Sequence, residues 1–451
     1  MSVTTPIFRP GFCAKLGAGV DDGATEAGGV DGATDGAETD GATVGGTAVA
    51  PPEQAETIRA IPASMPKPLV RMRIVPPQTR DAVRVRYGLL PMDRDEPPVQ
   101  PHPNGAAAGG ILATVLGTGK RLSVNGGPAP PAALSYHRSM PSRTPVILDC
   151  DPGHDDALAI TLALARPELD LLAVTTVAGN APLEATTRNA LRVLTLLGRT
   201  AIPVAAGAPR PLVRPLHVAV NVHGTSGLDG ADLPEPGFAA RPEHAVELMR
   251  ALIEASPEPV TLIPTGPLTN IALLIRTYPR LLERVSRICL MGGAVGEGNV
   301  TASAEFNIWA DPDAAAIVFE AGRPLTMIGL DVTHLALVSA ADAARMAALG
   351  TRTGRVFADL LEFFGRFHRE RYGWDGSPIH DAVAVAHVAL PGLVRTETCR
   401  VDIETTSELT RGRTVADRAG LTGRDPNAEI GLGIDRGRFV DLLVGAVAAF
   451  A

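Results

Sequence analysis

The sequence predicts an α/β domain with a largely parallel open sheet flanked by helices, preceded by an N-terminal arm without stable structure. Two observations support this prediction. From about residue 141 to residue 451, apolar strand-like runs alternate with segments whose apolar residues recur at helical spacing, which is typical of α/β domains. Residues 1–140 instead repeat Gly, Ala, Pro, Asp and Thr without an apolar period, so they cannot bury enough apolar area to offset the entropy lost on ordering.

Within the predicted domain, strands and helices follow one another in turn. We expect strands at 145–150, 170–179, 260–266, 287–294 and 325–333. Because these strands are apolar almost throughout, both faces of the sheet should be covered, as in parallel sheets. We expect helices between them at 156–166, 184–198 and 268–278.

The arm, residues 1–140, offers little else. Its apolar runs at 69–77 and 111–124 are candidates for isolated strands. The second run resembles a phosphate loop, but Thr114 stands where the first Gly of that motif belongs, and Arg121 stands where Ser or Thr should follow Lys120. Two explanations of the arm stay open: a genuine disordered extension, or translation that starts at Met140.

Composition excludes several classes of protein. The net charge of −8 and the absence of a Lys/Arg cluster argue against a nucleic-acid partner. The four cysteines are widely spaced without a CxxC pair, so neither a disulfide framework nor a zinc site is expected. The N-terminus has no signal-peptide pattern, and no apolar run is long enough to span a bilayer. We therefore expect a soluble cytoplasmic protein without a membrane partner.

Four aspartates crowd the end of the first predicted strand: Asp149, Asp151, Asp155 and Asp156. Capping of the next helix explains one or two of them, and Asp311 before Pro312 is predicted to be such a plain cap. Four close carboxylates repel one another and should not all stay ionised without a cation. Oxygen ligands at this density suit Ca²⁺ or Mg²⁺.

Other strand ends also carry polar residues: Asn180, Thr265, Asn299, Glu305, Asn307, His380 and Asp381. The carboxyl ends of parallel strands are where open α/β sheets bind their ligands. Carboxylates and amides gathered there describe a pocket for a polyhydroxylated ligand such as a sugar.

An ordered set of motifs resembles the nucleoside hydrolases, the calcium-dependent N-ribohydrolases. The motifs are ILDCDPGHDDALAI, TTVAGN, VHGTSGLDG, PTGPLTNIA, LMGGA, SAEFNIWADPDAA, GLDVTH and HDAVAVA. They run from about Pro145 to the C-terminus in the family's order and spacing, and residues 1–140 share nothing with it. The resemblance implies a Rossmann-like nucleoside hydrolase fold, release of free base and ribose from ribonucleosides, and a homodimer or homotetramer.

The resemblance also implies roles for individual residues. The expected Ca²⁺ ligands are Asp151, Asp156, Asp381 and the backbone carbonyl of Thr265. The residues expected to hold the ribose are Asp155, Asn180, Asn299, Glu305, Asn307 and Asp381, with Met291 lining the ribose pocket. Asp151 would accept a proton from a metal-bound water as general base. His380 would protonate the leaving base, a task that suits histidine near neutral pH.

Base contacts are the least defined part of this comparison. His223 is expected over the base pocket, and His368 and Tyr372 fall where base-contacting residues occur in the family. His368 departs from the Tyr or Gln that is frequent there, so base preference stays open. The stretches GHDD and RYGWDGSPIHD lean towards the pyrimidine-preferring branch.

Two alternative functions share features with this sequence. A haloacid-dehalogenase-type phosphatase would use Asp149 as its nucleophile, but Pro152-Gly153 stand where that family expects Thr or Val. A non-catalytic nucleoside-binding protein would predict a broken ligand set, and every expected ligand is present. His334 and His387 lie in apolar stretches and receive no role.

Overall fold

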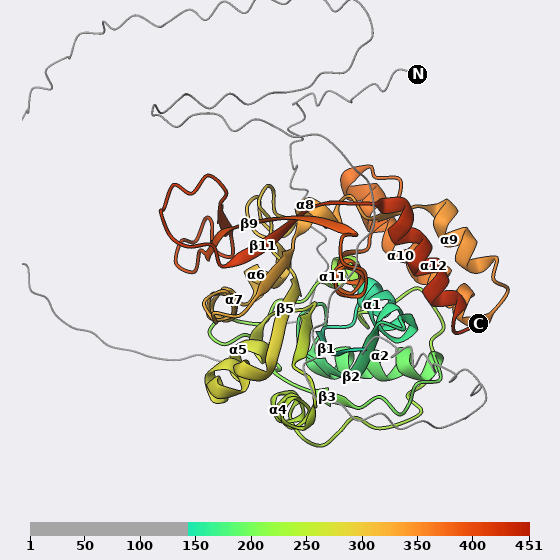
Figure 1. Ribbon diagram of the computed structural model, residues 1–451. Coiled ribbons are helices and arrows are strands. Elements are labelled where there is room, and N and C mark those ends of the chain that lie inside the picture. The colour runs from blue at the N-terminus through green and yellow to red at the C-terminus, as the bar shows by residue number, and fades with distance from the viewer. Residues whose placement is uncertain (1–142) are drawn as a thin grey trace, which may run out of the picture. The chain divides into compact units, whose positions relative to one another are not determined.

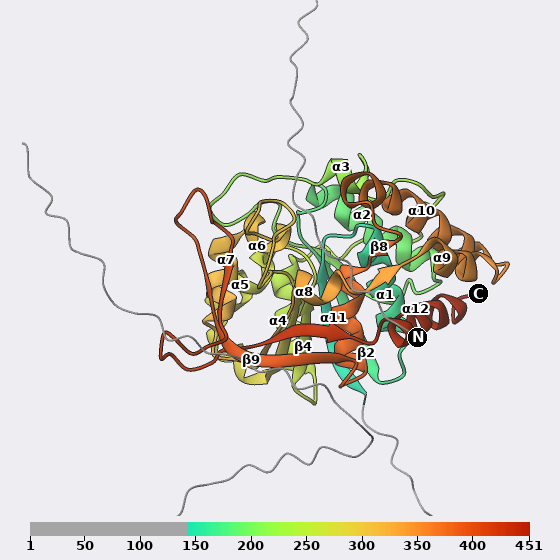
Figure 2. The ribbon, with the colours of Figure 1, turned by 90° about the horizontal axis from the view of Figure 1, so that it is seen from above.

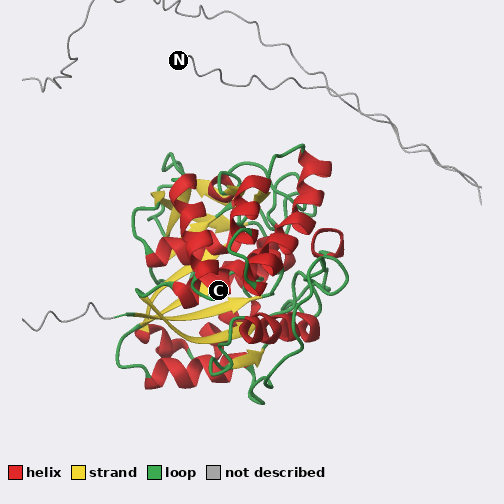
Figure 3. Cartoon of the chain, turned by 90° about the vertical axis from the view of Figure 1, so that its right-hand side faces the viewer, coloured by secondary structure: helices red, strands yellow, loops and turns green. Residues whose placement is uncertain are grey.

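A nine-stranded sheet runs through residues 143–451, the part of the chain that this computed structural model describes, and helices cover both faces (Figures 1 and 3). The predictions for the arm, residues 1–140, lie outside the described residues. Across the sheet the strands are β10 (Thr414–Asp417), β9 (Val394–Ile403), β11 (Ala428–Ile434), β6 (Leu325–Ile328), β5 (Val285–Met291), β4 (Val260–Pro264), β1 (Thr144–Cys150), β2 (Leu169–Thr176) and β3 (Val204–Ala206).

All neighbouring strands from β11 to β3 pair in parallel, and only β9 is antiparallel to its two neighbours, β11 and β10. The predicted largely parallel open sheet is therefore confirmed. Figure 2 shows β9 as a long strand that crosses one edge of the molecule. A separate hairpin pairs β7 (Leu337–Val338) with β8 (Ser377–Pro378).

The helices form two layers. One layer packs with β1 through Val146, Leu148 and Cys150, and the other packs with it through Ile147, because successive side chains of a strand point to opposite faces. On the first face lie α1 (His154–Ala165), α2 (Leu183–Leu196), α9 (Ala340–Ala347), α10 (Arg352–Tyr372), α11 (His380–Ala389) and α12 (Arg436–Ala448). On the second lie α4 (Ala245–Ala255), α5 (Thr269–Thr277) and α7 (Pro312–Phe319).

Short helical turns complete the fold: α3 (Val220–His223), η1 (Pro279–Arg284), α6 (Phe306–Ala310) and α8 (Leu330–Thr333). Within the described residues, no helix is long and apolar enough to cross a membrane. The predicted helical cap at Asp311 is confirmed, since its side chain accepts a hydrogen bond from the N–H of Ala314 and Pro312 opens α7.

The predicted strands and helices all occur, but several strands are shorter than predicted. The strands expected over 170–179 and 287–294 end at Thr176 and Met291. The strand expected over 325–333 ends at Ile328, and the next residues turn into α8. The turn comes at Gly329, where a Cβ atom would lie 2.7 Å from the carbonyl oxygen of Gly293. This close approach of two loops redirects the chain, and an apolar pattern alone does not reveal it.

The order of the strands defines one crevice. The chain passes from β1 to β2 and β3 on one side, then returns to β4 on the other side of β1. The loops after β1 and β4 therefore diverge at the carboxyl edge of the sheet. Open α/β sheets bind ligands at this kind of switch point.

Candidate active site

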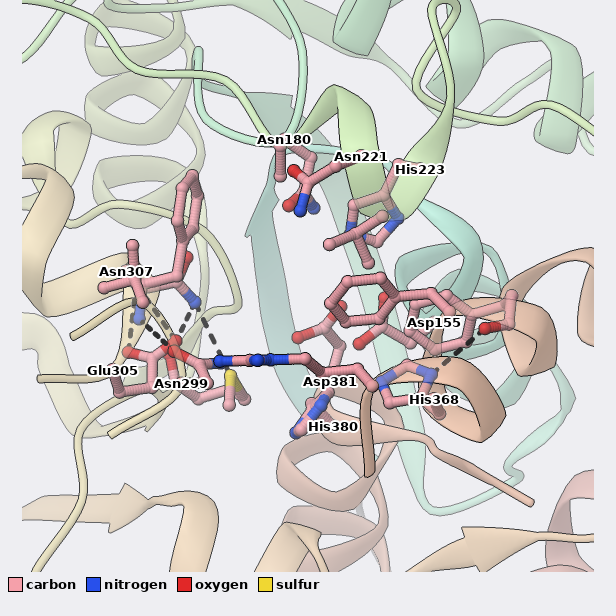
Figure 4. A pocket seen from close by; sticks show the side chains of 18 of the residues that line it. Asp155, Asn180, Asn221, His223, Asn299, Glu305, Asn307, His368, His380 and Asp381 are labelled. Atoms are coloured by element: carbon pink, nitrogen blue, oxygen red, sulfur yellow. Dashed lines mark hydrogen bonds between the residues drawn. The ribbon is translucent and has the colours of Figure 1, made fainter. Parts of the chain in front are cut away.

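A cavity of about 530 Å³ opens at this crevice. Of the fourteen residues predicted for the site, all but Asp151 and Asp156 line the cavity. Those two lie directly behind it, because Asn180 in the cavity wall donates its N–H to Asp151 Oδ2 over 2.7 Å and its amide to Asp156 over 3.5 Å. Figure 4 shows Asn299, Glu305 and Asn307 on one side of the cavity and His368 on the other, with Asp155 and Asp381 between them.

Four buried carboxylates form what we call the carboxylate end: Asp151, Asp155, Asp156 and Asp381. Oxygen atoms of Asp155, Asp156 and Asp381 lie within 4.8 Å of one another. Asp151 stands outside that trio, but its Oδ1 is buried and has no hydrogen-bond partner among residues 143–451. Asp156 is held between the N–H of Gly153 at 2.9 Å and the hydroxyl of Thr265 at 2.8 Å.

The electrostatics of this end favour a cation. Burial raises the pKa of Asp155 to about 6 and that of Asp156 to about 7. Burial and the neighbouring carboxylates raise the pKa of Asp151 and Asp381 well above the usual range. Carboxylates in this state are stabilised as anions by a bound positive charge. The all-oxygen donor set and the unpartnered oxygen of Asp151 fit Ca²⁺ or Mg²⁺.

Thr265 follows β4 and lies next to the carboxylate end, where its hydroxyl contacts Asp156. Its carbonyl oxygen accepts a hydrogen bond from the Asn307 amide at 2.8 Å, and a carbonyl retains a second lone pair for another contact. For Thr265, the sequence analysis predicted a role for the backbone carbonyl alone, as a ligand of the cation. The hydroxyl bond to Asp156 is an additional contact that the motif did not suggest.

Across the cavity from His368, the side chains of Glu305 and Asn299 are fixed by hydrogen bonds from main-chain N–H groups. Glu305 caps α6 by accepting the N–H groups of Asn307 and Ile308, and it also accepts that of Gly293. Burial raises the pKa of Glu305 to about 7. Asn299 accepts the N–H of Phe306 at 2.9 Å. Because each acceptor is fixed before a ligand arrives, little order is lost on binding.

Met291 ends β5 next to this group. Its carbonyl oxygen and its sulfur both lie near the Asn307 amide, at 3.2 and 3.5 Å. The side chain is almost fully buried but reaches the cavity. It therefore adds an apolar surface beside the polar groups of the cavity, next to the residues that the sequence predicted to hold the ribose.

Histidines and aromatic rings form what we call the imidazole end: His223, His334, His368, Tyr372 and Trp374. Tyr372 and Trp374 stack with ring centroids 4.5 Å apart, and His368 lies nearly parallel to Trp374. Flat, apolar faces of this kind suit a planar heterocycle. Burial lowers the pKa of His368 to about 4 and that of His223 well below its usual value, so both are neutral at pH 7.

His380 joins the two ends, since it precedes Asp381 at the start of α11. Its Nδ1 lies 2.8 Å from the hydroxyl of Thr333. Burial lowers the pKa of His380 well below its usual value. If the hydroxyl donates to Nδ1, the single proton of the neutral ring stays on Nε2.

Several lining residues had no sequence signal. His334, which received no role, lies 4.8 Å from the ring of Trp374 and 5.8 Å from that of His380, between centroids. Trp374 could have been suspected only because it precedes SPIHD. Other lining residues that the sequence did not single out are His217, Asn221, Trp309, Phe364, Phe367 and Arg371. His387 does not line the cavity.

Two glycines bring backbone against Asp151. A Cβ atom on Gly179 would overlap Asp151 Oδ2, and one on Gly266 would lie 2.7 Å from Oδ1. Asp149, by contrast, does not line the cavity. Its Oδ1 accepts hydrogen bonds from Thr175 and Asn270 at 2.6 and 2.8 Å, and its Oδ2 is buried without a hydrogen-bond partner among residues 143–451. Asp149 therefore lacks the access to a substrate in the cavity that the phosphatase alternative requires.

Comparisons with known proteins identify the family of this chain. The profile of the inosine-uridine preferring nucleoside hydrolases matches residues 146–441. A pyrimidine-specific ribonucleoside hydrolase RihA of Shewanella sp. (strain ANA-3) is 54% identical over 307 residues, covering 68% of this chain and 96% of that protein. The RihA protein of Citrobacter koseri is 52% identical over 308 residues, covering 68% of this chain and 99% of that protein.

Solved structures show the same likeness. The purine-preferring ribonucleoside hydrolase from Gardnerella vaginalis superposes with a TM-score of 0.65 at 33% identity, covering 68% of this chain and 99% of that chain. The plant nucleoside hydrolase PpNRh1 gives a TM-score of 0.64 at 31% identity, covering 68% of this chain and all of that one. The chain therefore belongs to the inosine-uridine preferring nucleoside hydrolase family and is an N-ribosyl hydrolase, as its motifs predicted.

Proposed function

We propose that this chain hydrolyses the N-glycosidic bond of pyrimidine ribonucleosides with Ca²⁺ bound at the carboxylate end. One observation carries the proposal: a buried set of carboxylates and a group of stacked aromatic rings belong to one and the same site around a single cavity. The first suits a cation and a sugar, and the second suits a base. The names of the curated relatives at 54% and 52% identity support a pyrimidine as that base.

The cation would be held by Asp151, Asp156, Asp381 and the Thr265 carbonyl. When bound, it would offset the negative charge of these groups and lower the pKa of a coordinated water. Calcium accepts six to eight oxygen ligands in flexible geometry, which suits a set drawn from three separate segments.

The residues of the chain would divide the reaction between them. Asp155, Asn180, Asn299, Glu305 and Asn307 hold the ribose hydroxyls in the rigid frame described above. As the bond from C1′ to the base nitrogen breaks, positive charge develops on the ribose, and the nearby carboxylates stabilise it.

Two proton transfers complete the reaction. Asp151 Oδ1, which has no partner among the described residues, accepts a proton from the water that adds to C1′. The departing base would take a proton from Nε2 of His380 in its protonated form, which leaves the neutral imidazole. The proton taken up by Asp151 then passes to solvent, and His380 regains one from solvent before the next turnover. One water is consumed, and the products are ribose and the free base. General acid–base steps of this kind contribute roughly 10²–10⁴-fold each.

The test is a panel of purine and pyrimidine ribonucleosides, assayed for free ribose with and without a chelator. Uridine and cytidine should react at least about 10-fold faster than inosine and adenosine, a ratio that pocket contacts can supply. Chelation should abolish the reaction, and added Ca²⁺ should restore it. Full activity after exhaustive chelation would overturn the calcium proposal, and equal rates on all four nucleosides would overturn the pyrimidine preference.

By resemblance to the family, we also propose a homodimer or a homotetramer. Light scattering at assay concentration decides this, and a monomeric mass would contradict it.

A further inference from the structure

We infer that His154 is a positioning residue: it fixes the tautomer of His223 so that His223 presents an unprotonated Nε2 to the base of the substrate. The inference rests on the proposed function and deepens it. His154 is the histidine of GHDD, and it does not line the cavity. It lies behind His223, almost fully buried, with its ring parallel to those of Phe363 and Phe364 at centroid distances of 5.3 and 5.2 Å.

The proton on His154 can be placed from its partners. Nε2 lies 2.8 Å from the main-chain carbonyl oxygen of Asp229. A carbonyl can only accept, so Nε2 carries a hydrogen. Within residues 143–451, the ring nitrogens contact that carbonyl and another imidazole but no carboxylate. A ring this buried without a counter-ion is neutral, and its one proton therefore leaves Nδ1 as a bare acceptor.

That acceptor determines the state of His223. The two Nδ1 atoms are 3.1 Å apart, and two lone pairs at this distance would repel each other. His223 therefore donates from Nδ1, and the neutral ring keeps a bare lone pair on Nε2. The main-chain N–H of His154 also points at His223 Nδ1, but at 3.5 Å. This longer contact favours the opposite tautomer and is the weaker of the two.

The consequence concerns which bases the cavity accepts. His223 lines the cavity and stacks with Phe364 at a centroid distance of 5.4 Å, on the side where the aromatic rings gather. A bare Nε2 accepts a hydrogen bond from an N–H of a base, such as N3–H of uracil or the amino group of cytosine. A base without a donor on that edge would leave the acceptor unpaired, which costs binding.

The structure offers a matched pair of variants. In His154→Leu the ring acceptor is lost, and the main-chain N–H of residue 154 remains as the partner of His223, so the proton of His223 should move to Nε2. In His154→Asn the side-chain oxygen can take the place of Nδ1 and accept from His223. The apolar variant should therefore switch the tautomer, and the amide variant should keep it.

The first measurement is the tautomer itself, by long-range ¹⁵N–¹H NMR of histidine-labelled protein, with His223 assigned by its absence in His223→Gln. We expect the Nδ1–H form in the wild-type protein and in His154→Asn, and the Nε2–H form in His154→Leu. An Nε2–H form in the wild-type protein overturns the inference without any variant having to fold. An unchanged tautomer in a folded His154→Leu overturns it as well.

The second measurement is kinetic. In His154→Leu, kcat/KM for uridine should fall by about 10-fold, the value of one hydrogen bond, and His154→Asn should recover most of it. Discrimination against 3-methyluridine, which lacks N3–H, should be present in the wild-type protein and lost in His154→Leu. Equal losses in both variants would show a merely structural role. If the wild-type protein releases no ribose from uridine, the proposed function has failed, which is a different result.

Discussion

The carboxylate end and the imidazole end of the cavity are built in different ways. The aspartates lie at the carboxyl edge of the sheet, in the loop after β1 and in the first turns of α1 and α11. Members of the imidazole end come from α3, from the end of α8 and from α10 with the loop after it, none of which belongs to the nine-stranded sheet. Three of the four carboxylates therefore follow a strand of the sheet directly, and Asp381 begins a helix after the β7–β8 hairpin. Base recognition depends entirely on segments outside the sheet. The two ends should respond separately to substitution.

The largest effect is expected at the carboxylate end. Asp156→Ala should lower kcat/KM by at least about 10³-fold, within the range of lost acid–base and metal catalysis, and should abolish calcium binding measured by titration calorimetry. The substitution removes a proposed ligand and leaves Thr265 and Gly153 without their acceptor.

Asp311→Ala is the matched control, because Asp311 is also a buried carboxylate but caps α7 instead. It should lower the free energy of unfolding by at least about 1 kcal/mol, as lost caps do, because Asp311 also accepts hydrogen bonds from the N–H of Leu212 and the hydroxyl of Thr269. Calcium binding should stay intact. If Asp156→Ala still bound calcium, Asp156 would not be a ligand, and the proposed difference between the two aspartates would be wrong.

A smaller effect should appear where the two ends meet. His380→Ala should slow uridine hydrolysis by about 10²-fold, the lower range for a general acid. The loss on p-nitrophenyl riboside should be much smaller, because nitrophenolate leaves without a proton. Asn307→Ala should slow both substrates alike, since we propose that Asn307 contacts the ribose that they share. Equal losses on both substrates for His380→Ala would show that His380 does not protonate the leaving group.

Calcium should also change stability in a pH-dependent way. In the calcium-free folded chain, burial raises the pKa of Asp156 and Glu305 to about 7, above the value of about 4 expected when unfolded. Between these values the folded chain binds more protons than the unfolded chain, so the stability of the chelated protein should fall as pH rises.

Bound calcium would replace the proton on Asp156, a proposed ligand, so its stabilising effect should grow from pH 5 to pH 7. It should reach about 2.7 kcal/mol at a free concentration of ~100 times Kd. Thermal unfolding with calcium and with chelator at both pH values measures it. A calcium-dependent shift in Tm that is the same at pH 5 and pH 7 would contradict the electrostatic account.

The smallest effect concerns the arm. A chain that begins at Met140 should retain kcat/KM, calcium binding and cooperative unfolding, because every site residue named above lies between Asp151 and Asp381. Activity and Tm of the shortened and full chains provide the test. A shortened chain that is inactive or insoluble would place part of the functional unit before Met140.

The sequence predicted the carboxylate end well for a physical reason. Asp151, Asp155 and Asp156 follow a buried strand directly, and such a strand is visible as an apolar run. Some residues that the sequence missed lie in irregular segments, where no period marks the direction of a side chain. Others, such as Phe364 and Phe367, lie on α10, where a helical period can predict burial but not contact with a cavity. Contact between His154 and His223 joins positions 69 residues apart, and only the folded chain brings them together. Trp374 and His334 meet in the same way, across two loops.

The glycines beside Asp151 have a bearing on how sequence variants of this chain should be interpreted. Glycine to alanine is usually ranked as a mild exchange, since it adds one methyl group. At Gly179 or Gly266 that methyl group would occupy the space of the Asp151 carboxylate. Such an allele would keep every proposed ligand and still be expected to lose the enzyme. Scores that count only altered ligands would therefore classify a null allele as benign.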